Sequence, residues 1–323
     1  MSTYYTSKYS GEQIDEAVKK ILEGGMTGDY ADRQLSNLDT SQGALANLGA
    51  GVRPNLLINP FFEVNQRGQS AYTANGYTVD MWARPTGDLT VTPIENGVRL
   101  TWTAGIYFRQ GFENPSKYNG KSVTISGMFS NPQSVTGCSL RLRVNGSFSG
   151  FSVPVTGAGC FFATFQMPNE VTELWFEIGA SSGSIDWNYA KLEEGSTQTL
   201  AYQDDTGAWQ LLPQPESDYA TQLAKCQRYL LPIGMGSVLE NIRVSRITSS
   251  GMYFFVPTPA QMRVAPTLSG DAQIITMSNS AQTGFAFSTQ LLCNGINVVA
   301  AKDGHGLSDA RLNLQNCFLS AEF

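Results

Sequence analysis

The first apolar residues of the chain recur at helical spacing. They follow Ser10 and Gln13, whose spacing forms a capping box, and they stop before Gly24. The stripe consists of Ile14, Val18, Ile21 and Leu22. A helix of about three turns is marginal in water by itself, so the stripe is predicted to pack against the same helix of neighbouring chains. Packing onto a surface of its own chain is the alternative.

Between positions 32 and 48 the main apolar residues are leucines separated by small polar residues. They are Leu35, Leu38, Leu45 and Leu48. Four leucines are too few to form a core within one chain, but they can pack around a symmetry axis. Residues 1–53 are therefore predicted to be a helix and spacer that become ordered in a homotrimer, with the boundary at Pro54.

Residues 54–205 are predicted to form a jelly-roll-like β-sandwich. Apolar and polar residues alternate there, or β-branched and aromatic residues dominate, in short runs bounded by Gly, Asn or Pro. The clearest runs span residues 89–94, 98–102, 122–129, 139–144, 161–165 and 173–178. Many short strands at such spacing favour two packed sheets.

A connecting helix is predicted within residues 206–232, and Pro232 is expected to end it. Its apolar face would contain Tyr219, Leu223, Cys226 and Leu230. Residues 233–323 are predicted to form a C-terminal β-rich domain. Its clearest strands span residues 252–256, 273–277, 284–288, 295–299 and 317–323. Several of them are apolar on both faces, which suits a trimer axis.

Composition narrows the classes of function. The 323 residues carry a net charge of −6, whereas nucleic-acid binders usually present a basic patch, so no nucleic-acid partner is expected. No run approaches the roughly 20 apolar residues that span a bilayer, and the first residues lack the apolar core of a signal peptide. We therefore expect synthesis in the cytoplasm and no membrane insertion. The five cysteines are odd in number and widely spaced, which favours buried free thiols over disulfides or a zinc site.

Catalytic patterns are weak in this sequence. His305 is the single histidine and lies in a glycine-rich turn, so we predict a loop residue and no metal centre. Residues 179–183 match a nucleophile elbow around Ser181, but a strand is predicted to follow where a helix is required. The doublets at 193–194 and 204–205 put neighbouring carboxylates on opposite strand faces. We expect no enzyme activity and no cofactor.

Two phrases carry a family resemblance. Residues 55–68, Asn-Leu-Leu-Ile-Asn-Pro-Phe-Phe-Glu-Val-Asn-Gln-Arg-Gly, resemble the opening of a carbohydrate-binding-module-like sandwich found in phage and prophage tail fibres, and residues 223–229 resemble the short helix that follows it. Residues 77–82, 120–126 and 185–196 resemble further strands of that module. The resemblance implies a receptor-binding protein on the virion surface, attached to other virion proteins through its N-terminal region.

Sugars are held by aromatic rings and planar polar groups, so exposed aromatic residues are the candidate binding residues. The candidates are Trp102, Tyr107, Trp187 and Trp209. The alternative is that Trp82, Trp102, Trp175 and Trp187 fill the sandwich core. Gln66 and Arg67 are expected to stabilise a turn. The predicted function is a homotrimeric phage fibre or spike that binds a host cell-surface glycan during attachment. A structural or decorating fibre protein and a glycan depolymerase are the alternatives.

Overall fold

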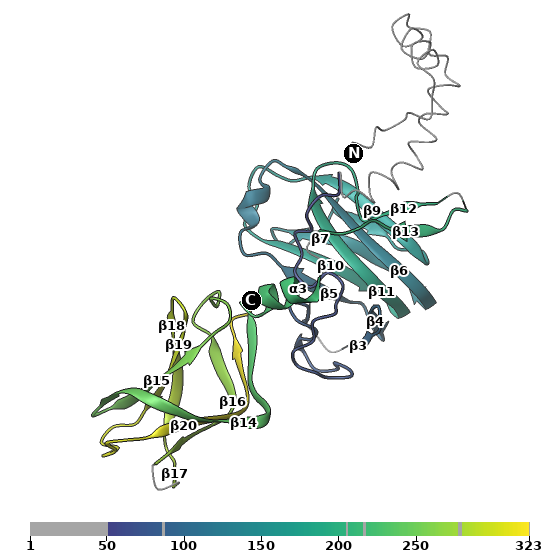
Figure 1. Ribbon diagram of the computed structural model, residues 1–323. Helices are drawn as coiled ribbons and strands as arrows, with labels where there is room; N and C mark the ends of the chain where they lie inside the picture. The colour runs from purple at the N-terminus through teal and green to yellow at the C-terminus, as the bar shows by residue number, and fades with distance from the viewer. Residues whose placement is uncertain (1–50, 86–87, 205, 216–217, 277–279, 323) are drawn as a thin grey trace, which may run out of the picture. The chain divides into compact units, whose positions relative to one another are not determined.

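The computed structural model describes residues 51–85, 88–204, 206–215, 218–276 and 280–322 (Figure 1). Arg53–Ala201 and Gln214–Phe323 form one compact unit, and residues 202–213 are described separately. The described part of the chain is mainly β, as predicted. The predicted oligomerisation residues Ile14, Val18, Ile21, Leu22, Leu35, Leu38, Leu45 and Leu48 lie outside the described residues.

Two antiparallel sheets in the described residues share one apolar core, which confirms the predicted β-sandwich (Figure 1). The order of the six-stranded sheet is β1 (Gly76–Tyr77), β2 (Ala83–Arg84), β5 (Ile106–Gly111), β10 (Leu174–Ala180), β7 (Ser139–Val144) and β8 (Ser152–Pro154). The order of the five-stranded sheet is β3 (Leu89–Ile94), β4 (Gly97–Trp102), β11 (Ser182–Glu194), β6 (Ser122–Thr136) and β9 (Gly159–Gln166). A short 3₁₀ helix, η1 (Pro115–Tyr118), follows β5.

Stacked aromatic rings fill the centre of this core. Trp187 on β11 lies parallel to Phe176 on β10, with ring centroids 5.7 Å apart, and meets Trp82 edge-on at 5.2 Å. Both tryptophans are fully buried. Their indole N–H groups are satisfied inside the protein, by the carbonyls of Tyr189 and Asn59. Trp187 and Phe176 join the two sheets, because Trp187 comes from the five-stranded sheet and Phe176 from the six-stranded sheet.

The opening phrase of the sandwich forms a hydrogen-bonded loop against the core. Asn59 donates to the carbonyls of Val64 and Asp80 and accepts from the Val64 N–H group. The side chain of Gln66 donates to the carboxylate of Asp80, and the guanidinium of Arg67 pairs with Glu322. Gln66 and Arg67 therefore stabilise the loop, as predicted from the sequence.

The helix after the sandwich is shorter than predicted. α3 spans Tyr219–Cys226, and Asp218 caps its first turn by accepting from the Thr221 N–H group at 2.9 Å. Pro232 does not end it, because the chain has already entered β14, where Pro232 pairs with Phe318. Among the described residues, no strand pairs with this part of β14 on its other side, so the missing N–H group breaks no ladder there.

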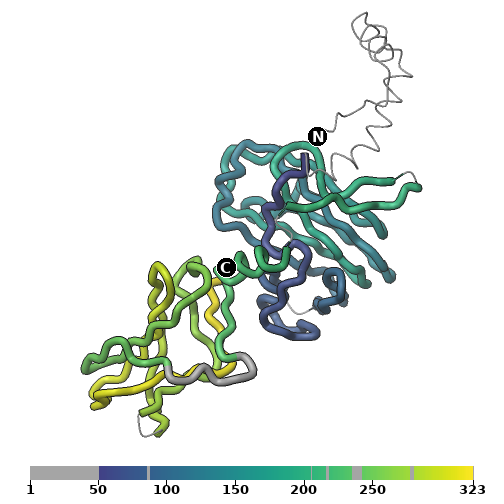
Figure 2. Tube along the Cα trace, in the orientation of Figure 1, coloured from purple at the N-terminus to yellow at the C-terminus, as the bar shows by residue number. Residues whose placement is uncertain are grey.

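α3 belongs to the sandwich core and is not a detached spacer. Cys226 is fully buried in that core, and Tyr229 just after the helix joins it. The first described residues of the chain, purple in Figure 2, run beside α3, where the Asn59 N–H group donates to the side chain of Gln222 at 2.8 Å. The second apolar core begins at Leu231.

Residues 230–322 form a C-terminal lobe that contains one strongly curved antiparallel sheet among the described residues. Its strand order is β17 (Ala281–Gln282), β16 (Thr267–Ile275), β20 (Arg311–Ser320), β14 (Leu230–Thr248), β15 (Gly251–Pro257), β19 (Gly295–Ala301) and β18 (Ala286–Leu292). The sheet curls until β18 approaches the segment before β16, where the Thr289 hydroxyl donates to the carbonyl of Pro266. This confirms the predicted C-terminal β-rich domain.

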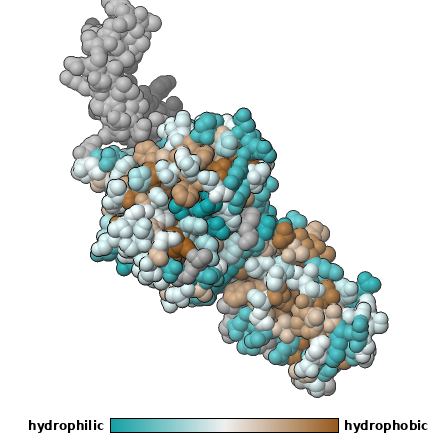
Figure 3. Space-filling model, turned by 180° about the vertical axis from the view of Figure 1, so that it is seen from behind, coloured by the Kyte–Doolittle hydropathy of each residue, from teal (hydrophilic) through white to brown (hydrophobic). Residues whose placement is uncertain are grey.

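Apolar side chains also reach the surface of the C-terminal lobe, and Figure 3 shows them in brown among polar ones. Phe255 and Val264 are 36% and 44% exposed. The trimer axis predicted along these strands stays a prediction.

Asp80 is expected to make the stability of the protein depend on pH. Burial raises the pKa of its carboxyl group to about 6, against the opposing hydrogen bonds from Gln66. The same group titrates near 4 in an unfolded chain. Its contribution to stability is therefore complete below about pH 4 and is lost as the pH rises through about 6. We expect the free energy of unfolding to fall by about 2–3 kcal/mol over that interval. Urea denaturation at a series of pH values measures this change.

Asp80→Asn should flatten the profile between these pH values. Asp186→Asn is the matched control with the opposite sign, because the hydrogen bonds from Arg99 lower the pKa of Asp186. Its contribution is present at neutral pH and is lost in acid. If the wild-type chain and the Asp80→Asn variant give the same slope, the buried carboxylate has no such role.

Candidate functional site

Two of the predicted sugar-binding residues lie in the core, and this prediction is corrected. Trp102 is 2% exposed and Trp187 is 0% exposed. Both side chains point between the two sheets, so neither ring can stack on a ligand. The indole N–H group of Trp102 donates to the carbonyl of Ile106 at 3.0 Å. The alternative interpretation, that large aromatics fill the sandwich, is right for Trp82, Trp102 and Trp187.

Trp209 lies on a strand, although the sequence predicted only a linker and connecting helix within residues 206–232. It is half-buried on β13 (Trp209–Leu211), which pairs with β12 (Ala201–Gln203) in a two-stranded sheet. The carboxylate of Asp204 holds the turn by accepting from the Thr206 hydroxyl at 2.6 Å and the side chain of Gln210 at 2.8 Å. These bonds lower the pKa of Asp204 to about 2. Trp209 therefore belongs to a short, well-bonded hairpin that also contains Tyr202 on β12.

Tyr107 lies on the outer face of the six-stranded sheet, away from the core. Three arginines surround its ring: the guanidinium carbons of Arg141 and Arg143 are each 4.8 Å from the ring centroid, and that of Arg109 is 5.9 Å away. The residues come from β5 and β7, which both pair with β10. Phe148, which is 42% exposed, covers Arg141 from the other side at 4.3 Å.

Trp175 extends this outer face along β10, although the alternative interpretation of the sequence put it in the core. Its ring packs closely against Gly111 of β5. A Cβ atom at that position would come within 2.8 Å of the ring, so only glycine leaves room for it. Arg109 stacks on the indole at 4.0 Å, and the indole N–H group donates to Glu173 at 2.7 Å. The alternation of residues along β10 could have predicted this outward position, since Trp175 shares its side of the strand with Glu177 and not with Phe176.

Glu177 is fully buried beneath the arginines and orients them. Its carboxylate accepts from the Nε atoms of Arg141 at 3.2 Å and Arg143 at 3.0 Å, and pairs with Arg109 at 3.8 Å. Burial lowers the pKa of Arg143, but its contacts with Glu177 outweigh that effect and the net shift is upward. We call this surface the aromatic–arginine face. Its residues are Tyr107, Arg109, Arg141, Arg143, Phe148, Trp175 and Glu177.

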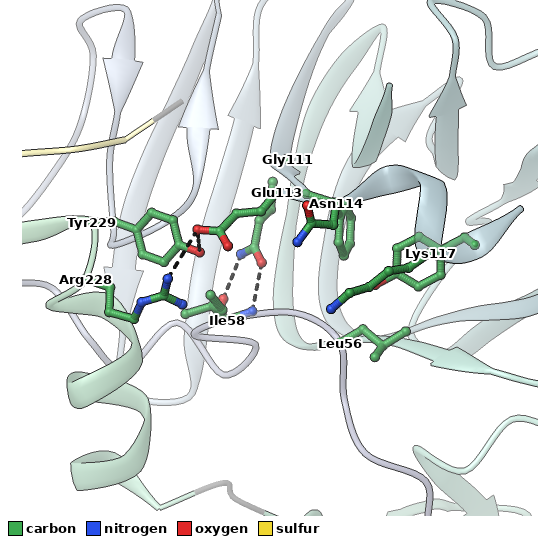
Figure 4. A pocket seen from close by; sticks show the side chains of 11 residues that line it. Leu56, Ile58, Gly111, Glu113, Asn114, Lys117, Arg228 and Tyr229 are labelled. Atoms are coloured by element: carbon green, nitrogen blue, oxygen red, sulfur yellow. Dashed lines mark hydrogen bonds and ion pairs between the residues drawn. The ribbon is translucent and has the colours of Figure 1, made fainter. Parts of the chain in front are cut away.

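A pocket of about 210 Å³ lies at the end of β5 (Figure 4). Most of its polar groups are already paired within the protein. Gln110 exchanges two hydrogen bonds with the backbone of Ile58, and Glu113 accepts from the hydroxyl of Tyr229 and pairs with Arg228. A ligand there would have to compete with these bonds, whereas the aromatic–arginine face presents rings and unused N–H groups. The face is therefore the better candidate site.

The residues of the weak catalytic patterns have structural positions in the fold. Ser181 lies between β10 and β11, so a strand follows it, as predicted, and no nucleophile elbow forms. Glu193 is buried while Glu194 pairs with Lys121 at the surface. His305 lies in a loop, as predicted, but it is half-buried: its Nε2 atom bonds the Thr248 carbonyl at 2.8 Å and its Nδ1 atom accepts from the Leu307 N–H group.

The cysteines and the search for metal ligands add no site in the described residues. Cys138, Cys160, Cys226 and Cys317 are buried free thiols, as predicted, and Cys293 is exposed. Burial raises the pKa of Cys138 and of Cys160 to about 12. No group of three or more His, Cys, Asp or Glu side chains among the described residues could hold a metal ion. In the same part of the chain, every helix is too short or too polar to cross a membrane.

No family model matches the chain, and no curated protein matches it in sequence. Among solved structures, the N-terminal CBM22-1–CBM22-2 tandem domain of Paenibacillus barcinonensis Xyn10C is similar at 12% sequence identity. The similarity covers 85% of this chain and 99% of that chain, with a TM-score of 0.29. A TM-score this low does not establish a common fold, and it supports no conclusion about ligands.

Proposed function

We propose that this protein binds a carbohydrate through the aromatic–arginine face. The observation that carries the proposal is the pair of half-buried rings, Tyr107 and Trp175, held on the outer face of a sheet beside three guanidinium groups. The C–H surface of a sugar ring stacks on aromatic faces, and its hydroxyl groups accept hydrogen bonds from planar donors. The face offers both kinds of contact within one surface.

The rings and arginines are held in place before any ligand arrives. Trp175 is fixed by its contacts with Gly111 and Arg109 and by the hydrogen bond of its indole N–H group to Glu173. Rigid groups lose less conformational entropy on binding. The affinity of one face can still be modest, since a single sheet surface buries a limited area of the ligand.

The resemblance to phage tail fibres supports a place for this activity on a virion. In this proposal the N-terminal region joins the chain to other virion proteins as a homotrimer, and the sandwich binds a host cell-surface glycan during attachment. Three copies on one particle raise the effective concentration of the binding face. A weak single site is then sufficient for adsorption, and light scattering of the full chain should show the mass of three chains.

The binding test compares ring-deleted variants of the full chain on a glycan array. Tyr107→Ala and Trp175→Ala should each weaken binding of the selected glycan by about ten-fold or more, because a central aromatic contact is lost. Trp175→Phe keeps a ring and should retain most of the affinity. Isothermal titration with the best glycan gives the dissociation constants.

Phe162→Ala is the matched control, because Phe162 is a 46% exposed aromatic residue on β9 of the other sheet. It should bind as the wild-type chain does. Equal binding by the wild-type, Tyr107→Ala and Trp175→Ala chains would reject the aromatic–arginine face as the site. If the wild-type chain binds no glycan on the array or on host cells, the structural or decorating role replaces the proposal.

A further inference from the structure

The aromatic–arginine face carries a positive charge on a negatively charged protein. Arg109, Arg141 and Arg143 face two carboxylates, Glu177 and Glu173, which leaves one positive charge on this surface. The whole chain carries a net charge of −6. Neutral sugars do not need such a local reversal of sign, so the charge has to be explained by the ligand or by the fold.

The fold uses only part of the hydrogen-bonding capacity of these guanidinium groups. Arg141 and Arg143 direct their Nε atoms to Glu177, and Arg143 also donates from Nη1 to the carbonyl of Gly146 at 3.0 Å. Within the part of the chain that the structure describes, the Nη atoms of Arg141 and all three nitrogens of Arg109 make no hydrogen bond, and Nε of Arg109 is buried. One carboxylate therefore orients the cluster and leaves several N–H donors available.

Aromatic rings shield the flat sides of the guanidinium groups from water. The side chains of Arg109, Arg141 and Arg143 are only 24%, 11% and 16% exposed. An ion pair at the remaining edges is less screened than a pair between fully exposed side chains. The planar fork of a guanidinium group also matches carboxylate, phosphate and sulfate groups in geometry.

We infer that the carbohydrate recognised by this face is acidic: a saccharide whose carboxylate, phosphate or sulfate group binds the guanidinium edges while its ring stacks on Tyr107 or Trp175. This inference rests on the proposed function and adds the chemical class of the ligand. It explains why three arginines, and not the amides typical of neutral-sugar contacts, surround the rings.

The test uses matched pairs of polymers that differ only in charge. Immobilised full chain is exposed to polygalacturonate and its carboxyl-reduced form, to phosphomannan and its dephosphorylated form, and to dextran sulfate and dextran. Polyphosphate serves as an anion without a sugar ring. The acidic member of at least one pair should bind about ten-fold or more tightly than its neutral form, since each charge-assisted bond has that effect. The difference should shrink at high salt. The pair that responds identifies the anionic group.

Arg109→Gln is the first variant, because Arg109 makes no hydrogen bond among the described residues and its ion pair with Glu177, at 3.8 Å, is the longest of the three. It should lose most of the preference for the acidic form while thermal unfolding stays unchanged. Arg109→Lys keeps the charge without the planar fork and should retain part of the preference. Arg99→Gln is the charge-matched control, since Arg99 lies on β4 of the other sheet in a pair with Asp186. It should bind as the wild-type chain does.

The outcomes separate this inference from the proposed function. Equal binding of acidic and neutral forms, lost on Tyr107→Ala, overturns the acidic ligand but keeps the carbohydrate site. Polyphosphate that binds as tightly as every acidic saccharide overturns the requirement for a sugar. Loss of acidic binding in Arg99→Gln as large as in Arg109→Gln shows that only net charge matters and also overturns the inference. No binding to any saccharide rejects the proposed function itself.

Discussion

Replacing Trp187 with alanine is expected to destabilise the sandwich by about 3–5 kcal/mol, the range for removing a fully buried large aromatic side chain. Trp187 is 0% exposed and contacts rings from both sheets, including Phe129 on β6 at 5.8 Å and Phe176 on β10 at 5.7 Å. The cavity left behind cannot close easily, because its walls are strands held by hydrogen bonds on both sides. A loss of this size is a large part of the total stability of a domain.

Urea denaturation followed by circular dichroism measures the loss, since the signal does not depend on the deleted indole. Trp187→Phe is the informative companion, because it keeps a stacked ring and loses only the bond to the Tyr189 carbonyl and some volume. Its free energy of unfolding should be clearly higher than that of Trp187→Ala. If alanine at this position leaves the unfolding midpoint unchanged, the stacked rings do not hold the two sheets together.

Glu177→Gln is expected to have the second largest effect, a decrease of about 2–3 kcal/mol in the free energy of unfolding. Glutamine keeps the shape of the side chain but leaves three arginines close together without the carboxylate that they share. Removing one partner of a buried pair usually costs more than this. The arginines are 11–24% exposed, however, and solvent reduces their repulsion.

Salt dependence distinguishes repulsion from a simple packing defect. The destabilisation by Glu177→Gln should be smaller at high ionic strength, because salt screens the three like charges. Glu194→Gln is the matched control: Glu194 pairs with Lys121, and both side chains are nearly half exposed. It should change stability by less than about 1 kcal/mol. A salt-independent loss in Glu177→Gln would show that charge is not the cause.

The candidate site was only partly predictable from the sequence. Tyr107 was predicted, and the alternation of residues 139–144 already places Arg141 and Arg143 on the polar side of one strand. Their meeting with Tyr107 and Trp175 depends on β10 pairing with β5 on one edge and β7 on the other. These strands are far apart in the chain, and no local sequence pattern specifies which strands pair and therefore which side chains become neighbours.

Local patterns in the sequence determined most of the secondary structure and the division into a sandwich and a C-terminal β lobe. Strands β3 and β7 have the predicted bounds, because alternation and flanking turn residues act over short distances. β14 was missed, since Pro232 favours the end of a helix unless a free sheet edge tolerates it. Only the tertiary structure decided which tryptophans are buried, how far α3 extends and which charges surround Glu177. Those outcomes depend on the packing and pairing of distant segments, because the stabilising contacts form only when the sheets assemble and not within any single stretch of residues.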